Sequence, residues 1–189
     1  RSQLAQHDVF HCSCHGQFNF DEPLKSGLAV AGQGEAAILS LRDLLDLKLK
    51  GLRLAVLSAC ETGISDLQFA DEAISLPTGL LQAGAAGVVA SLWSVSDLST
   101  MLLISRFYVL WRSHLNEPAK ALTEAQKWLR DAKRSELLEH CKTLLPELYT
   151  PTTANQTDCA SARQSLEAAI KKSDYSHPYY WAAFGYTGS

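Results

Sequence analysis

Hydrophobic and polar positions along the chain follow two periods, one typical of strands and one typical of helices. Short apolar runs predict strands at residues 7–14, 28–30, 52–59, 86–93 and 179–186. Apolar residues at helical spacing predict helices at 41–49, 77–83 and 98–113, and a further one that opens at Glu117-Pro118. Strands that alternate with helices at short spacing indicate right-handed βαβ units and a parallel sheet. The pattern therefore predicts an α/β fold.

Turn and capping residues mark where several of these elements begin and end. Ser40 and Asp43, three residues apart, resemble a capping box at the start of a helix. Pro77 suits the first turn of the next helix, and Gly84 stands where a C-terminal cap is expected. Residues 131–175 differ from the rest, because they are charged and have few large apolar side chains. We interpret them as a partly helical, peripheral insertion.

Composition narrows the class of protein. The chain has 189 residues, of which 47% are hydrophobic and 20% charged, as expected for one globular domain. A formal net charge of -3 gives no basic surface for nucleic acid or for an acidic membrane. No apolar run approaches the roughly 18 residues of a membrane span, and the first residues do not resemble a signal peptide. We therefore expect a soluble, cytoplasmic protein.

Cysteine usage fits the same compartment. The five cysteines are odd in number and irregularly spaced, which argues against a secreted disulfide framework. Reduced thiols are therefore expected, and one of them stands in a distinctive place. In the segment LAVLSACETG, Cys60 follows a buried strand and precedes a polar turn. The carboxyl ends of strands in open parallel sheets are where ligands bind and catalytic groups gather.

The segment HCSCHG supplies a partner for this cysteine. Side chains alternate between the two faces of a strand. One face therefore carries His11, Ser13 and His15, and the other face carries Cys12 and Cys14. A zinc site of two cysteines and two histidines would need both faces, which argues against a zinc-binding module. His15 ends its strand beside Gly16, as Cys60 ends the next core strand.

A histidine and a cysteine at one edge of a sheet form a plausible catalytic dyad. An imidazole raises the thiolate fraction of a neighbouring cysteine, whose free pKa is about 8.5, and can protonate a leaving amine. The backbone N–H groups of Cys60 and Gly16 could hold the oxyanion of a tetrahedral intermediate. Caspases place their histidine about 50 residues before the cysteine, and His15 stands 45 residues before Cys60. Acyl transfer from a peptide is the reaction class that this pattern predicts.

Five motifs in order carry a resemblance to a known family: HCSCHG, PLKSGLAVAG, LSACETG, LLQAGAAGVVASLWSVSD and HPYYWAAF. Together they resemble a CHAT domain, the caspase-like module found in bacterial proteins alongside tetratricopeptide repeats and related to separase. The match runs from about residue 8 to 130 and resumes at 177–186. The resemblance implies a caspase-like three-layer α/β sandwich, with a mostly parallel central β-sheet flanked by helices.

The same resemblance implies a function. The family's catalytic pair falls on His15 and Cys60, and its oxyanion hole on Gly16 and the amide of Cys60. An intact dyad implies a cysteine endopeptidase that acts on a protein substrate through a thioester acyl-enzyme, without metal or cofactor. Other domains or a partner, such as helical repeats, are expected to restrain it. We expect one domain over 1–189 that lacks the family's N-terminal strand and helix, which were removed or lie in a segment not included.

Substrate contacts follow from the resemblance, with alternatives left open. One wall of the substrate groove falls on Ser91, Trp93, Ser94 and Val95, which could bind an extended peptide as an added strand. Trp93 could equally be an ordinary packed aromatic. Asp97 could select Arg or Lys before the scissile bond, or it could be the N-cap of helix 98–113. Glu61 could tune the pocket or be a solvated turn carboxylate. The competing function is a catalytically silent, caspase-like interaction or regulatory module.

Overall fold

The computed structural model describes residues 4–17, 19, 21–32, 37–58, 75–94, 96–113, 117–151 and 156–189. The chain divides into two compact units. The first, here the sheet unit, comprises residues 1–95 and 183–189, and the second, the helical unit, comprises residues 96–182.

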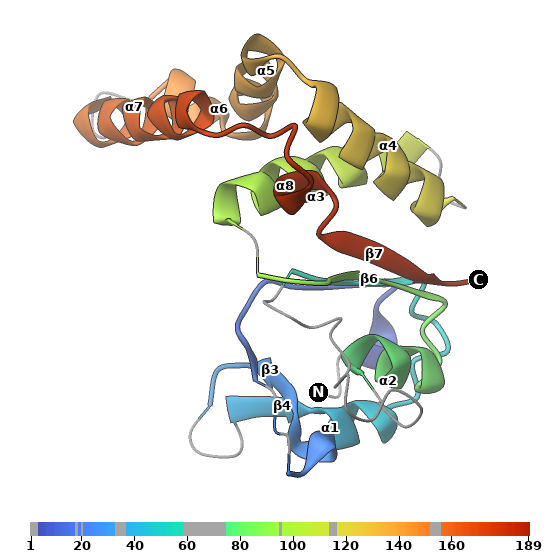
Figure 1. The fold of residues 1–189 in the computed structure, drawn as a ribbon. Coiled ribbons are helices and arrows are strands. Elements are labelled where there is room, and N and C mark those ends of the chain that lie inside the picture. Colours follow the sequence, from blue (N-terminus) through green and yellow to red (C-terminus); the bar gives the residue numbers. More distant parts are fainter. Residues whose placement is uncertain are drawn as a thin grey trace. The chain divides into compact units, whose positions relative to one another are not determined.

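The sheet unit is built on a four-stranded sheet (Figure 1). Its strands, in spatial order, are β1 (Val9–Cys12), β5 (Leu54–Leu57), β6 (Gly87–Ser91) and β7 (Phe184–Gly188). The first three are parallel, and β7 is antiparallel to β6. The predicted α/β class with a mostly parallel sheet is confirmed. The strands predicted at 7–14, 52–59 and 86–93 are present but shorter, and His15 lies three residues beyond the end of β1 rather than at its end. The carboxyl ends of β1, β5 and β6 consequently meet at one edge of the sheet.

A second, smaller sheet follows β1 directly. It consists of β2 (Gly16–Gln17), β3 (Gly27–Ala29) and β4 (Ile38–Ser40), all antiparallel in the order β2-β3-β4. The strand predicted at 28–30 is confirmed, one residue earlier. Two short 3-10 helices, Leu4–Gln6 and Pro23–Lys25, precede β1 and β3. This small sheet holds the backbone just after the predicted catalytic histidine.

Helices α1 (Leu41–Leu45) and α2 (Leu76–Gln82) pack together in the sheet unit, and α2 contacts β6. Their apolar faces join β3, β5 and β6 in a core whose fully buried members include Leu28, Leu41, Leu44, Leu57 and Leu80. Burying each such leucine contributes roughly 1.5–3 kcal/mol. This core anchors the strands whose ends form the sheet edge.

The predicted caps of these helices are confirmed. The Ser40 hydroxyl accepts the Asp43 N–H at 3.2 Å, and the Asp43 carboxylate accepts the Ser40 N–H at 2.9 Å, which is a complete capping box. Gly84 ends α2 with φ of 111°, a left-handed conformation that glycine adopts at low cost. Helix α1 is shorter than the predicted 41–49, because the backbone of Leu49 turns to donate to the Ala83 carbonyl.

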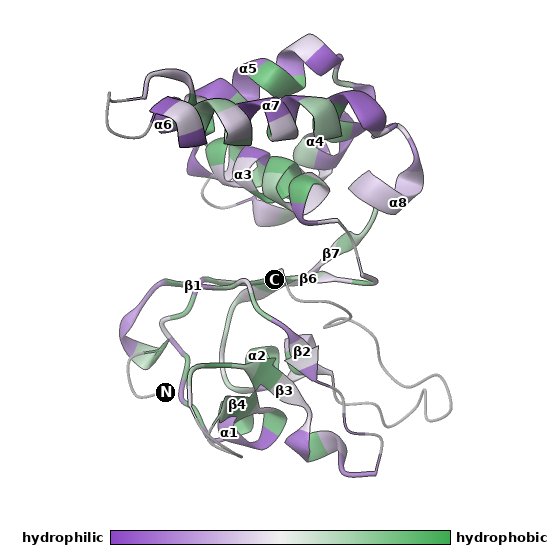
Figure 2. Ribbon diagram, turned by 90° about the vertical axis from the view of Figure 1, so that its left-hand side faces the viewer, coloured by the Kyte–Doolittle hydropathy of each residue, from purple (hydrophilic) through white to green (hydrophobic). Residues whose placement is uncertain are grey.

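The helical unit contains six helices in its described residues: α3 (Asp97–Ser113), α4 (Pro118–Asp131), α5 (Arg134–Leu144), α6 (Pro146–Tyr149), α7 (Gln156–Lys172) and α8 (Pro178–Trp181). Helix α3 contacts α4, α5 and α8, and Figure 2 shows hydrophobic residues recurring along it. The helices predicted at 98–113 and from Pro118 are confirmed. Residues 131–175 are helical over much of their length. Among the described residues, no helix is both long and apolar enough to span a bilayer.

The last predicted strand, 179–186, is wrong in its first half. Pro178 opens the short helix α8, whose start is capped by the His177 ring accepting the Tyr179 N–H at 3.2 Å. The strand begins only at Phe184, which is buried, whereas Tyr179 is 43% exposed. The aromatic residues of this segment therefore do not all belong to one buried strand. Proline and a local cap outweigh the strand preference of the tyrosines.

Candidate active site

The edge formed by the carboxyl ends of β1 and β5 holds the predicted catalytic histidine. These strands pair in parallel with Cys12 opposite Leu57, and the Ser58 N–H donates to the Cys12 carbonyl at 3.0 Å. His15 lies three residues beyond Cys12, and Cys60 stands three residues beyond Leu57 in the sequence. Cys60 and the neighbouring Glu61 lie outside the described residues.

The backbone of His15 is fixed while its side chain is exposed. The His15 carbonyl accepts the N–H of Ala29 at 2.8 Å, which ties the end of the β1 segment to β3. Because β3 also carries the fully buried Leu28, this anchor is continuous with the core. An imidazole with a held backbone and a solvent-facing ring can exchange protons with a bound substrate.

The N–H of Gly16 is oriented by the small sheet. Gly16 pairs with Leu28, and the neighbouring bond from Ala29 to His15 identifies this as a non-hydrogen-bonded pair. In such a pair, the two residues do not exchange hydrogen bonds, so the Gly16 N–H points away from β3. This geometry agrees with the predicted use of the amide as an oxyanion donor.

The predicted alternation of side chains along HCSCHG is confirmed. His11, Ser13 and His15 are exposed, whereas Cys12 and Cys14 are half-buried and pack against the core of the sheet unit. The two cysteine sulfur atoms lie 3.2 Å apart. Burial, together with the hydrogen bond to Cys14, raises the pKa of Cys12 to about 12, so this thiol is protonated at neutral pH. Over the described ranges, no three metal-ligating side chains cluster.

Ser58 is a residue of this edge that the sequence analysis missed. Its hydroxyl lies 3.0 Å from Nε2 of His11 and 3.4 Å from the Cys12 carbonyl. Although His11 is exposed in part, the partial burial of its ring lowers its pKa, which favours the neutral form. With the hydroxyl donating to the carbonyl, Ser58 accepts from the His11 Nε2–H. The serine of LSAC was visible in the sequence, but nothing local indicated a partner on β1.

The predicted wall of the substrate groove follows β6. Ser91 is buried and pairs with Phe184, and the Leu92 N–H donates to the Ala183 carbonyl at 2.6 Å. The β7 side of this backbone is therefore occupied, and β5 pairs with β6 on the other side as far as Ala90, so no peptide strand can add beside these paired residues. Trp93 is half-buried and Ser94 exposed, while Val95 lies outside the described residues.

The model of the CHAT domain family matches residues 1–189, the full length of the chain. The chain belongs to the CHAT domain family. The predicted resemblance and its caspase-like fold class are thereby confirmed, and the protein is placed in a family related to caspase-like peptidases. No curated protein matches the sequence.

The first turn of α3 corrects one interpretation of Asp97 in this CHAT domain. The Ser96 hydroxyl accepts the Ser99 N–H at 3.3 Å and lies 3.0 Å from the Ser99 hydroxyl. Ser96 is therefore the N-cap, and Asp97 is the first helical residue, with an exposed side chain. Both residue types favour an N-cap, and only the position where the helix begins decides between them. Selection of substrate by Asp97 remains a prediction.

Proposed function

We propose that this CHAT domain is a cysteine endopeptidase that uses a dyad of Cys60 and His15. The parallel register of β1 and β5 carries the proposal, because both residues stand three positions beyond the pair Cys12–Leu57. Neighbouring parallel strands that end together deliver the segments after them to one edge of a sheet. The exposed ring of His15 and the outward amide of Gly16 lend further support.

In the proposed reaction, His15 accepts the proton of the Cys60 thiol as the sulfur attacks the carbonyl carbon of the scissile peptide bond. The amides of Gly16 and Cys60 stabilise the resulting oxyanion. The bond to nitrogen then breaks, the leaving amine takes the proton from His15, and a thioester remains. Water, deprotonated by His15, hydrolyses this thioester and regenerates the thiol.

We further propose that the substrate is a cytoplasmic protein and that other domains or a partner protein, such as helical repeats, control access to it. The cleavage preference is proposed to be for Arg or Lys before the scissile bond, through Asp97. Ser91, Trp93, Ser94 and Val95 would line the groove, with Glu61 beside the nucleophile. The likeness to the CHAT family supports these assignments.

The test is hydrolysis of fluorogenic peptides that end in Arg, Lys, Asp, Leu or Met. We expect turnover after Arg or Lys that is lost in Cys60→Ala and in His15→Ala. Cys159→Ala is the matched control, because it removes a buried thiol of α7, in the helical unit. Cleavage after Asp or an apolar residue would keep the dyad and remove Asp97 from the pocket. If no peptide is cleaved, even when partner domains are present, the result would favour the catalytically silent interaction module.

A further inference from the structure

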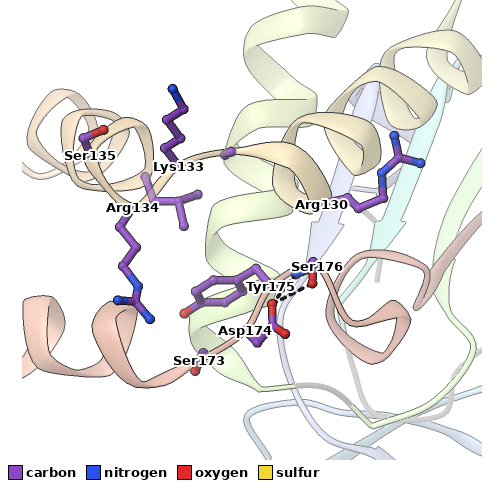
Figure 3. A pocket seen from close by; sticks show the side chains of 10 residues that line it. Arg130, Lys133, Arg134, Ser135, Ser173, Asp174, Tyr175 and Ser176 are labelled. Atoms are coloured by element: carbon purple, nitrogen blue, oxygen red, sulfur yellow. Dashed lines mark hydrogen bonds between the residues drawn. The ribbon is translucent and has the colours of Figure 1, made fainter.

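The helical unit contains a cavity of about 520 Å³ where α4 meets α5 and the chain leaves α7 (Figure 3). Its lining includes three cationic side chains, those of Arg130, Lys133 and Arg134, and one carboxylate, that of Asp174. Small-molecule sites typically measure roughly 300–1,000 Å³. The cavity is therefore large enough for an organic ligand.

The positive charge of the lining is not balanced from within. Arg130 makes a two-point ion pair with Asp131, with both N–O distances at 2.7 Å. Lys133 and Arg134 have no ion pair within 4.0 Å in the described part of the chain. The Asp174 carboxylate accepts the Ser176 hydroxyl at 2.7 Å and the Ser176 N–H at 3.1 Å. The hydrogen bonds of Ser176, and to a smaller extent the charge of Arg134, lower the pKa of Asp174, so this carboxylate offsets only part of the positive charge of Lys133 and Arg134.

The start of α5 adds to this positive potential. The Lys133 carbonyl accepts the first hydrogen bonds of the helix, from the amides of Glu136 and Leu137. The amides of Arg134 and Ser135, in the first turn, have no carbonyl of the helix to bond and carry the positive end of its dipole. Lys133, Arg134 and Ser135 all line the cavity. The Glu136 carboxylate accepts the Lys133 N–H at 2.7 Å and offsets part of this positive potential, which leaves the amides of Arg134 and Ser135 for an anion.

Tyr175 provides an independent sign of a missing partner. Its side chain lines the cavity, is 5% exposed, and its hydroxyl has no hydrogen-bond partner among the described residues. In Figure 3 the ring reaches into the middle of the lining side chains, with the hydroxyl on the side of Arg134 and Ser173. Burial raises the pKa of Tyr175, and an interaction with the Ser173 hydroxyl, which does not meet hydrogen-bond geometry, lowers it in part. A protonated, buried phenol without a well-formed hydrogen bond is costly unless a ligand accepts its proton in a hydrogen bond.

We propose that this cavity binds a small phosphorylated molecule, with its phosphate at the start of α5 and held by Lys133, Arg134 and the Tyr175 hydroxyl. A phosphate presents three strong acceptor oxygens, which suits cations, helix amides and a hydroxyl that approach from different directions. The remaining volume, beside Leu137 and the Tyr175 ring, would take the organic part. This site is separate from the proposed peptidase chemistry and does not depend on it.

The experiment measures the thermal stability of the protein with inorganic phosphate and with adenosine 5′-monophosphate, at constant ionic strength. We expect either probe to raise the melting temperature, and the double variant Lys133→Gln with Arg134→Gln to need at least about tenfold more of it. Lys127→Gln, an exposed lysine of α4 outside the cavity, is the control and should respond like the unmodified protein. If the nucleotide raises the melting temperature at a lower concentration than inorganic phosphate does, the site binds a phosphoester. If the two probes need equal concentrations, the site binds a free anion.

Tyr175→Phe separates binding from folding. Without a probe, this variant should melt at the same or a higher temperature, because it loses an unpaired hydroxyl. With phosphate or the nucleotide, the concentration needed should rise about tenfold, the loss expected for one charge-assisted hydrogen bond. The proposal is overturned if neither probe stabilises the protein, or if the Lys133/Arg134 and Tyr175 variants respond as Lys127→Gln does.

Discussion

Nε2 of His11 lies 3.0 Å from the hydroxyl oxygen of Ser58 and so joins strand β1 to the residue that follows β5. His11 lies four residues before His15, and Ser58 two residues before Cys60. The bond therefore connects the two segments that carry the proposed dyad. A side-chain hydrogen bond at this place supplements the backbone bond from Ser58 to Cys12.

Ser58→Ala should lower kcat of the proposed peptidase about tenfold, with little change in KM, because small displacements of catalytic groups are costly. The bulk stability should change by only about 1 kcal/mol, the usual value of one hydrogen bond. Ser58→Thr keeps the hydroxyl and should restore most of the rate. Full activity of Ser58→Ala would show that the bond does not position the dyad. If neither the unmodified protein nor any variant cleaves peptides, the result contradicts the proposed peptidase function and not the positioning role of Ser58.

Thiol labelling at pH 7 with iodoacetamide should distinguish the cysteines by rate. We expect Cys60 to react first, and His15→Ala to slow it, since the thiolate is the reactive form. Cys12 should react slowly, because burial and Cys14 raise its pKa to about 12. Cys141 is fully buried and its pKa is also raised by burial, so it should stay unlabelled in the folded protein. Mass spectrometry of digests gives the order, and preferential labelling of Cys12 would contradict this description of the edge.

Gly27→Ala should destabilise the protein by about 2–3 kcal/mol through overpacking. A Cβ on Gly27 would collide with the backbone carbonyl of Leu39 and approach the Ile38 side chain to 2.7 Å. Gly51→Ala is the control, since its Cβ would meet nothing within 4 Å, and should change the free energy of unfolding by less than about 0.5 kcal/mol. Urea denaturation measures both. Equal effects would mean that the β3–β4 contact is looser than described.

Local signals in the sequence accounted for much of the sheet unit. The capping box of Ser40 and Asp43, the left-handed Gly84 and the alternation before His15 each depend on residues close in the chain. The core strands β5 and β6 are continuous apolar runs, and this pattern predicts buried strands. These features were sufficient to place His15 in the segment that follows a core strand, although that strand ends at Cys12 and Gly16 begins β2.

Features that depend on distant pairing were not predictable. Gly16 and Gln17 are residue types that are common in turns, and they form a strand only because they pair with residues of β3. Ser58 gained its role from His11, 47 positions away. The boundaries of the two units were also not predicted, because the composition changes near residue 131, whereas the chain enters the helical unit at Ser96 and returns to the sheet at Ala183. Pairing partners of this kind are chosen by the tertiary fold.

Stability should fall as the pH drops below about 7, in part because of His140. Burial, and then the positive charge of Arg106, lower the pKa of His140 from 6.5. The unfolded chain therefore binds a proton first as the pH falls through 6.5, and the stability from the neutral ring is lost toward the folded pKa. His140→Gln should reduce this loss between pH 7 and 5, measured by urea denaturation. In NMR titrations, Arg106→Gln should raise the pKa of His140 in part, because burial remains.

Ser96 and Asp97 can be separated by their effects on folding and on specificity. Ser96→Ala removes the hydroxyl that accepts the Ser99 N–H and should cost about 1 kcal/mol of stability, the usual value of an N-cap. Asp97→Asn keeps the shape, removes one favourable charge from the first turn of α3 and should cost only about 0.3–1 kcal/mol.

Specificity should show the opposite order. If Asp97 selects the residue before the cut, Asp97→Asn lowers kcat/KM for peptides ending in Arg or Lys by at least about tenfold relative to Leu, because a charge-assisted contact is lost. Ser96→Ala should leave that ratio unchanged. An unchanged ratio in Asp97→Asn, measured on an active enzyme, would assign Asp97 to helix stabilisation alone and require another source of selectivity at the groove.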